Sequence, residues 1–105
     1  MLQFDEQADE SKIHVHVGQK FKVILHENPT TGFRWKPIAS GEPVCKLLDD
    51  SFDLDEGTIG SGRIHYWFFQ AVKEGSAKIE FAYSRSWEHD KTPARTFTLA
   101  VNVRT

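Results

Sequence analysis

Hydrophobic and polar residues alternate along most of this chain, and a period of two is typical of β-strands. Between residues 12 and 17, the apolar side chains of Ile13, Val15 and Val17 share one face. The alternation restarts after Gly18 and continues to His26. Similar runs predict further strands over residues 35–38, 44–48, 52–55, 64–72, 77–84 and 97–103. No segment shows a convincing helical period.

These runs together predict an all-β fold, an immunoglobulin-like β-sandwich of about seven to eight antiparallel strands. The run at 64–72 is apolar on both faces, with Trp67 and Phe69 on one of them, as a central strand can be. Residues 1–105 fit a single domain. The polar residues 1–10 are expected to form a loosely held terminus.

Composition and charge narrow the function classes. Thirteen basic and fifteen acidic residues give a formal net charge of -2, without the basic footprint of a nucleic-acid binder. No apolar run approaches the ~18 residues of a membrane-spanning helix, so no membrane partner is expected. The acidic start lacks the apolar segment of a signal peptide, which predicts a cytoplasmic protein or a mature secreted domain. Nothing indicates a cofactor, or more than a monomer.

Three long polar connections stand out, at residues 27–34, 57–62 and 85–94. Successive connections of an antiparallel sandwich alternate between its two ends, so these three are expected at the same end. The opposite end would carry only short turns, at Gly18-Gln19 and Glu74-Gly75. This asymmetry predicts that one end of the sandwich is a contact surface.

The first loop, Asn28 to Trp35, reads as a stiff protrusion rather than an ordinary hairpin turn. Pro29 fixes its own φ angle, and Thr30 and Thr31 are β-branched. Gly32 can adopt a positive φ angle and lets a partner approach closely. A loop that already has its bound shape loses little entropy on binding.

The other two loops offer different chemistry. Gly57 to Gly62 exposes backbone that an extended partner strand can pair with, although a flexible linker has the same composition. In the third loop, Trp87 lies among polar residues. It is therefore either an exposed binding anchor or a lid folded back onto the core, and the polar neighbours favour the anchor.

At these loops the sequence resembles the chagasin family of cysteine-peptidase inhibitors, and the likeness spans about residues 12 to 104. The segment 28–35, Asn-Pro-Thr-Thr-Gly-Phe-Arg-Trp, matches that family's first-loop motif along its full length. The segment 60–63 matches a Gly-x-Gly-Gly pattern except at Arg63, and 85–88 matches Arg-Pro-Trp-Glu except at Ser86. Arg63 would add bulk and charge at the cleft, and Ser86 would leave the third loop less stiff.

The resemblance implies reversible, non-covalent occlusion of a papain-like, cathepsin-L-like active site. The first loop would cover the catalytic Cys–His pair, with Thr31 closest to the nucleophile. The second loop would follow the non-primed subsites, while Trp87 would stack on the primed side and Arg85 would buttress its loop. The implied peptidase-binding residues are Asn28, Pro29, Thr30, Thr31, Gly32, Phe33, Gly60, Ser61, Gly62, Arg63, Arg85, Trp87 and Glu88.

Three other interpretations concern Cys45, the histidines and the sheet faces. Cys45, the only cysteine, lies in an apolar run where a buried thiol is more usual than a nucleophile, so no enzyme is expected. His14 and His16 share a strand face, and a metal site there is less usual than a solvated face. The main alternative is a non-catalytic adhesion or carbohydrate-binding sandwich that uses a sheet face, such as the side of Trp67 and Phe69.

Overall fold

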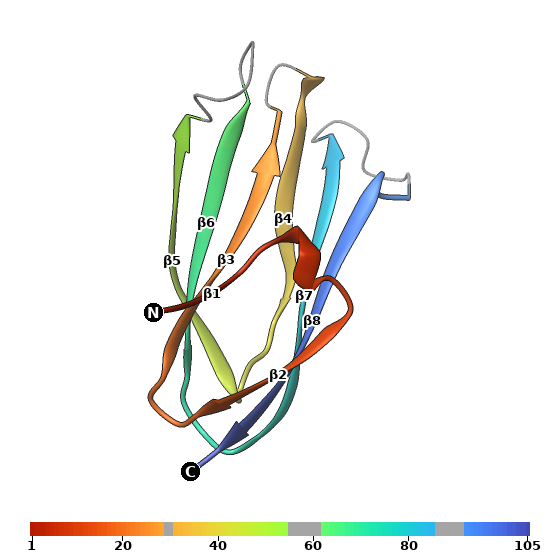
Figure 1. The fold of residues 1–105 in the computed structure, drawn as a ribbon. Coiled ribbons are helices and arrows are strands. Elements are labelled where there is room, and N and C mark those ends of the chain that lie inside the picture. The colour runs from red at the N-terminus through yellow and green to blue at the C-terminus, as the bar shows by residue number, and fades with distance from the viewer. Residues whose placement is uncertain (29–30, 55–61, 86–91) are drawn as a thin grey trace.

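Two four-stranded sheets pack face to face in the computed structural model, which describes residues 1–28, 31–54, 62–85 and 92–105 (Figure 1). The first sheet has the order β1-β3-β6-β5 and the second has the order β2-β8-β7-β4. The elements of the whole chain are β1 Leu2–Phe4, a 3-10 turn η1 Glu6–Ala8, β2 Ser11–His16, β3 Lys20–Glu27, β4 Phe33–Ser40, β5 Cys45–Leu54, β6 Arg63–Ala71, β7 Gly75–Arg85 and β8 Arg95–Arg104.

The predicted all-β sandwich is confirmed, with one difference in strand direction. β1 runs parallel to β3, and β2 runs parallel to β8, so that both sheets are mixed. The remaining pairs are antiparallel, as expected. Alternation along a strand is the same in both directions of pairing, so the sequence pattern could not distinguish them.

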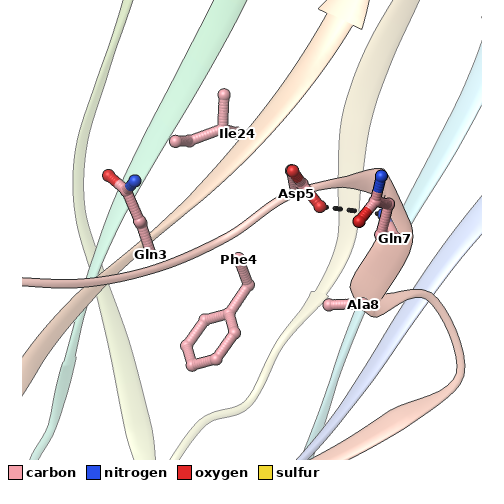
Figure 2. Close-up of a pocket in the computed structure, with 6 residues that line it drawn as sticks. All are labelled: Gln3, Phe4, Asp5, Gln7, Ala8 and Ile24. Carbon is pink, nitrogen blue, oxygen red and sulfur yellow. Dashed lines mark hydrogen bonds between the residues drawn. The ribbon is translucent and has the colours of Figure 1, made fainter.

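The N-terminal ten residues are more ordered than the sequence led us to expect. Leu2–Phe4 pairs with β3, and Phe4 packs edge-on against Phe21 with ring centroids 6.2 Å apart. Asp5 then caps the 3-10 turn by accepting a hydrogen bond from the Gln7 amide at 2.9 Å, beside a hollow that Ile24 also lines (Figure 2). One apolar anchor and an open edge on β3 are enough to order a segment whose composition is mostly polar.

The core consists of the inward-facing alternate residues of both sheets. Trp67 and Phe69 are 2% and 0% exposed, which identifies the inward face of β6. A buried Trp is worth roughly 4–6 kcal/mol of gross transfer free energy, so this face contributes strongly to stability. A ligand platform on the side of Trp67 and Phe69 is therefore wrong, because the opposite sheet covers these rings.

Strand β5 replaces the two short strands predicted at 44–48 and 52–55. A β-bulge shifts its register on β6 between Leu47 and Asp49. The extra residue breaks the period-two pattern and leaves Leu48 41% exposed, which is why the alternation seemed to end there.

The strand ends that flank the three long connections lie at one end of the sandwich, the upper end in Figure 1. There β3 ends at Glu27 and β4 begins at Phe33, while β6 begins at Arg63 and β7 ends at Arg85. The short β2–β3 and β6–β7 turns lie at the opposite end. This arrangement agrees with the alternation of connections expected from the sequence.

Candidate functional site

The structure describes seven of the predicted peptidase-binding residues, all of them at the loop end of the sandwich: Asn28, Thr31, Gly32, Phe33, Gly62, Arg63 and Arg85. The other six lie outside the described residues: Pro29, Thr30, Gly60, Ser61, Trp87 and Glu88. Ser86 lies outside them as well. The described part of the site therefore consists of the feet of the loops.

The foot of the first loop is closed by hydrogen bonds within the loop. The amide and the Oγ1 hydroxyl of Thr31 both donate to the carbonyl oxygen of Asn28, at 3.2 and 2.8 Å. The Asn28 amide donates to the Tyr83 hydroxyl at 3.1 Å, which ties the loop to β7. Gly32 has a φ angle of 80°, a conformation that is unfavourable for residues with a side chain.

Arg85 links the foot of the third loop to the first loop. Its Nε–H donates to the carbonyl oxygen of Thr31 at 3.0 Å. Its guanidinium lies 4.5 Å from the centroid of the Phe33 ring, the residue that it faces across the β4–β7 ladder. A cation over an aromatic face is attractive, so Arg85 holds both a backbone oxygen and a side chain of the first loop.

A ladder of aromatic rings continues from the loop foot into the core. Tyr83 stacks on Phe33 with ring centroids 5.2 Å apart, and it packs at a tilt against Trp35 with centroids 4.8 Å apart. The Trp35 indole N–H donates to the carbonyl oxygen of His26 at 2.9 Å, which satisfies its only side-chain donor. Trp35 is 3% exposed and Phe33 is half-buried, so both residues anchor the loop.

Beneath the first and second loops lies a buried carboxylate that the sequence analysis did not identify. Glu27 is 3% exposed and accepts hydrogen bonds from the Trp35 amide at 3.0 Å and from the Arg63 guanidinium. Its Oε1 also lies 3.0 Å from Nδ1 of His65, whose Nε2 lies 2.6 Å from Oδ2 of Asp50. The alternation of Leu25 with Glu27 on β3 is a signal for burial, but a glutamate that begins a polar stretch also fits a loop.

The pKa values of this cluster reflect its pairing. Burial alone would raise the pKa of Glu27, but hydrogen bonds from His65, the Trp35 amide and Arg63 outweigh burial and lower it. Burial alone would lower the pKa of His65, but its hydrogen bonds to Glu27 and Asp50 outweigh burial and raise it. Both shifts favour a charged His65 between two carboxylates.

The Arg63 side chain contacts other residues of this protein. Its side chain is 13% exposed, bonds to Glu27 and lies over the Phe52 ring at 4.4 Å from the centroid. The expected contact of Arg63 with a peptidase stays a prediction. The departure from glycine at position 63 therefore supplies a partner for a buried carboxylate.

The other candidate chemistry lies away from the loop end. Cys45 is fully buried, and burial raises its pKa to about 11, which leaves essentially no thiolate near neutral pH. His14 and His16 lie exposed on β2. Within the described ranges, no group of three or more His, Cys, Asp or Glu side chains could hold a metal ion. No helix in that part of the chain is long and apolar enough to cross a membrane.

Comparisons with known proteins agree on one family. The model described as Chagasin family peptidase inhibitor I42 matches residues 14–101. Amoebiasin-1 of Entamoeba histolytica is 31% identical and aligns over 98% of this chain and 100% of its own length. Amoebiasin-2 of the same organism is 29% identical, over 94% of this chain and 82% of its own.

The similarity extends to three dimensions. A crystal structure of the cysteine protease inhibitor EhICP2 from Entamoeba histolytica superimposes with a TM-score of 0.85, at 26% identity over 98% of this chain and 94% of the other. The family model covers the region from β2 to β8 and includes all three loops. With its loop end built on a two-sheet sandwich, this chain belongs to the chagasin family of peptidase inhibitors.

Proposed function

We propose that this protein inhibits papain-like cysteine peptidases reversibly and without forming a covalent bond, by occluding the active-site cleft with the three loops. The observation that supports this most is the bracing of the first loop, from Asn28 to Phe33, by its own hydrogen bonds and by Arg85. EhICP2, whose fold this chain shares, is a cysteine protease inhibitor. Membership in a family of inhibitors confirms the expectation that the chain is not an enzyme.

The bracing also explains how the first loop would resist cleavage. A cysteine peptidase attacks a carbonyl carbon whose oxygen moves into donors that stabilise the developing negative charge. The carbonyl oxygens of Asn28 and Thr31 already accept hydrogen bonds from within the inhibitor. Moving either oxygen toward the peptidase would break those bonds, so the loop would occupy the cleft in an unreactive pose.

The remaining loops would extend the contact on both sides of the first loop. Gly60, Ser61 and Gly62 would offer backbone groups to the peptidase, and Trp87 with Glu88 would contact the opposite side of the cleft. A standard interface of about 800 Å² per partner would result. Gly62 directly precedes Arg63, so the internally bonded guanidinium would hold the second loop without entering the cleft.

Inhibition assays with papain and with a cathepsin-L-like peptidase test this function. We expect sub-micromolar inhibition that is reversed by dilution, with the chain intact by mass spectrometry after prolonged incubation. A matched control, Lys73→Ala in the exposed β6–β7 turn at the opposite end, should inhibit as well as the unchanged chain. No inhibition of several such enzymes at high inhibitor concentration would refute the proposal.

A further inference from the structure

The buried cluster beneath the loops links the strands that flank two of them. Glu27 lies at the end of β3 and bonds to the Trp35 amide on β4, and the first loop connects these two strands. Asp50 on β5 and His65 on β6 contact each other, and the second loop connects that pair of strands. One chain of contacts therefore joins the feet of both loops and crosses from one sheet to the other.

The geometry of this cluster favours a proton on each ring nitrogen of His65, which is the imidazolium form. Both ring nitrogens lie within 3.0 Å of a carboxylate oxygen, and ionised carboxylates only accept hydrogen bonds. Glu27 accepts hydrogen bonds from the Trp35 amide and the Arg63 guanidinium, donors that suit an ionised carboxylate, whereas the Asp50 side chain is 51% exposed. A neutral imidazole has a single N–H, so it could satisfy only one of the two contacts.

The surroundings of the ring also favour the imidazolium. The His65 ring lies flat on Trp67, with centroids 3.8 Å apart and planes 12° apart. An aromatic face attracts a cation that is held against it. Among the described residues, the charged groups recorded at this ring are Glu27 on β3 and Asp50 on β5, with Arg63 on its own strand acting through Glu27. Two carboxylates contact the ring directly, whereas Arg63 shares Oε1 of Glu27 with it and has no recorded contact with the ring, so the direct contacts favour the added proton.

We propose that His65 and Glu27 are positioning residues, which hold the first and second loops in one fixed relation while His65 is protonated. This inference rests on the inhibitory function proposed above and extends it. When the imidazolium loses one of its two ring protons, a nitrogen lone pair faces a carboxylate, and one of the two contacts must open. Either the contact of His65 with Asp50 on β5 opens or its contact with Glu27 opens, and the feet of the two loops can then move relative to one another. Inhibition is then tighter at mildly acidic pH than at alkaline pH.

The test compares the unchanged chain with His65→Gln at matched pH values from about 5.5 to 8.5, a range centred near the ordinary titration of histidine. The inhibition constants are expressed as a ratio at each pH, which cancels the titration of the peptidase itself. We expect the variant to be weaker by roughly threefold to tenfold at the acidic end and nearly equal at the alkaline end. His14→Gln, an exposed histidine on β2, is the matched control and should give a ratio of one throughout.

Two further measurements keep the inference independent of the variant's folding and of the proposed function. Asp50→Asn changes a half-exposed side chain and should also reduce the pH dependence of the inhibition constant. In the free, unchanged protein, NMR should show His65 titrating above its ordinary midpoint, with the amides of Trp35, Thr31 and Gly62 shifting at that same midpoint. A constant ratio across pH, or loop amides that ignore the titration, would overturn the inference. Absence of inhibition at every pH, with the NMR coupling intact, would overturn only the proposed function.

Discussion

Replacing Arg85 with alanine should separate the contribution of loop bracing from that of direct contact. The substitution removes the hydrogen bond to the Thr31 carbonyl oxygen and the cation above the Phe33 ring. A bond from a charged donor is worth about 1.5–3 kcal/mol when buried, and about 1 kcal/mol at a partly exposed site such as this one. The cation–π contact adds about 0.5–1 kcal/mol.

Together these terms predict that Arg85→Ala weakens inhibition by about 1.5–2 kcal/mol, which corresponds to roughly tenfold to thirtyfold in the inhibition constant. The inhibition constant of Arg85→Lys should lie between those of the unchanged protein and Arg85→Ala, because an ammonium can donate to Thr31 but lacks the planar group that lies over Phe33. The assay is steady-state inhibition of a papain-like peptidase, together with mass spectrometry of the inhibitor. With its carbonyl oxygen released, the first loop should also become slowly cleavable near Thr31.

Arg104→Ala serves as the control, because Arg104 is an exposed arginine at the end of β8, away from the loops. It should leave both inhibition and cleavage unchanged. An inhibition constant for Arg85→Ala within twofold of the original would refute the reasoning. So would a loss of inhibition explained entirely by a lower melting temperature, since bracing concerns the loop rather than the whole fold.

Three further predictions follow from the same structure. Gly32→Ala must hold a side chain at φ 80°, so we expect a loss of about 1–2 kcal/mol in unfolding free energy and weaker inhibition; unchanged urea denaturation would contradict this. Trp87→Ala should weaken inhibition by about 2–4 kcal/mol with little change in melting temperature, whereas a large drop in that temperature would identify a lid on the core. Stability should also depend on pH in two opposite ways. The lowered pKa of Glu27 stabilises the fold above its ordinary 4.5 and ceases to do so as pH falls through the folded value. The raised pKa of His65 stabilises it below 6.5, and this is lost as pH rises through the folded value. Urea midpoints should therefore be highest between these pH values. A maximum above pH 8 would contradict the His65 assignment, and a maximum below pH 4 would contradict the Glu27 assignment.

The local pattern was sufficient for much of the fold. A strand displays its alternation wherever one face is buried, so the strands around Phe21, Ile79 and Leu99 could be predicted from residue order alone. Their number and the positions of the turns then favoured a sandwich. Direction of pairing and the bulge at Leu47 were not predictable, because both depend on the neighbouring strand rather than on the strand itself.

The sequence by itself determined that the three long connections start and end at one end of the sandwich and that Gly32 takes a positive φ angle, because strand alternation and turn residues act through local backbone preferences. Only the tertiary structure decided which contacts hold the feet of these connections in place. Glu27, Asp50 and His65 are far apart along the chain. A single acidic or basic residue in a sequence predicts a solvent-exposed side chain. Their role arises only when three strands bring their charges within hydrogen-bonding distance in a buried place, where unpaired charge is costly. The same pairing gives Arg63 a partner within the protein, which the sequence did not predict.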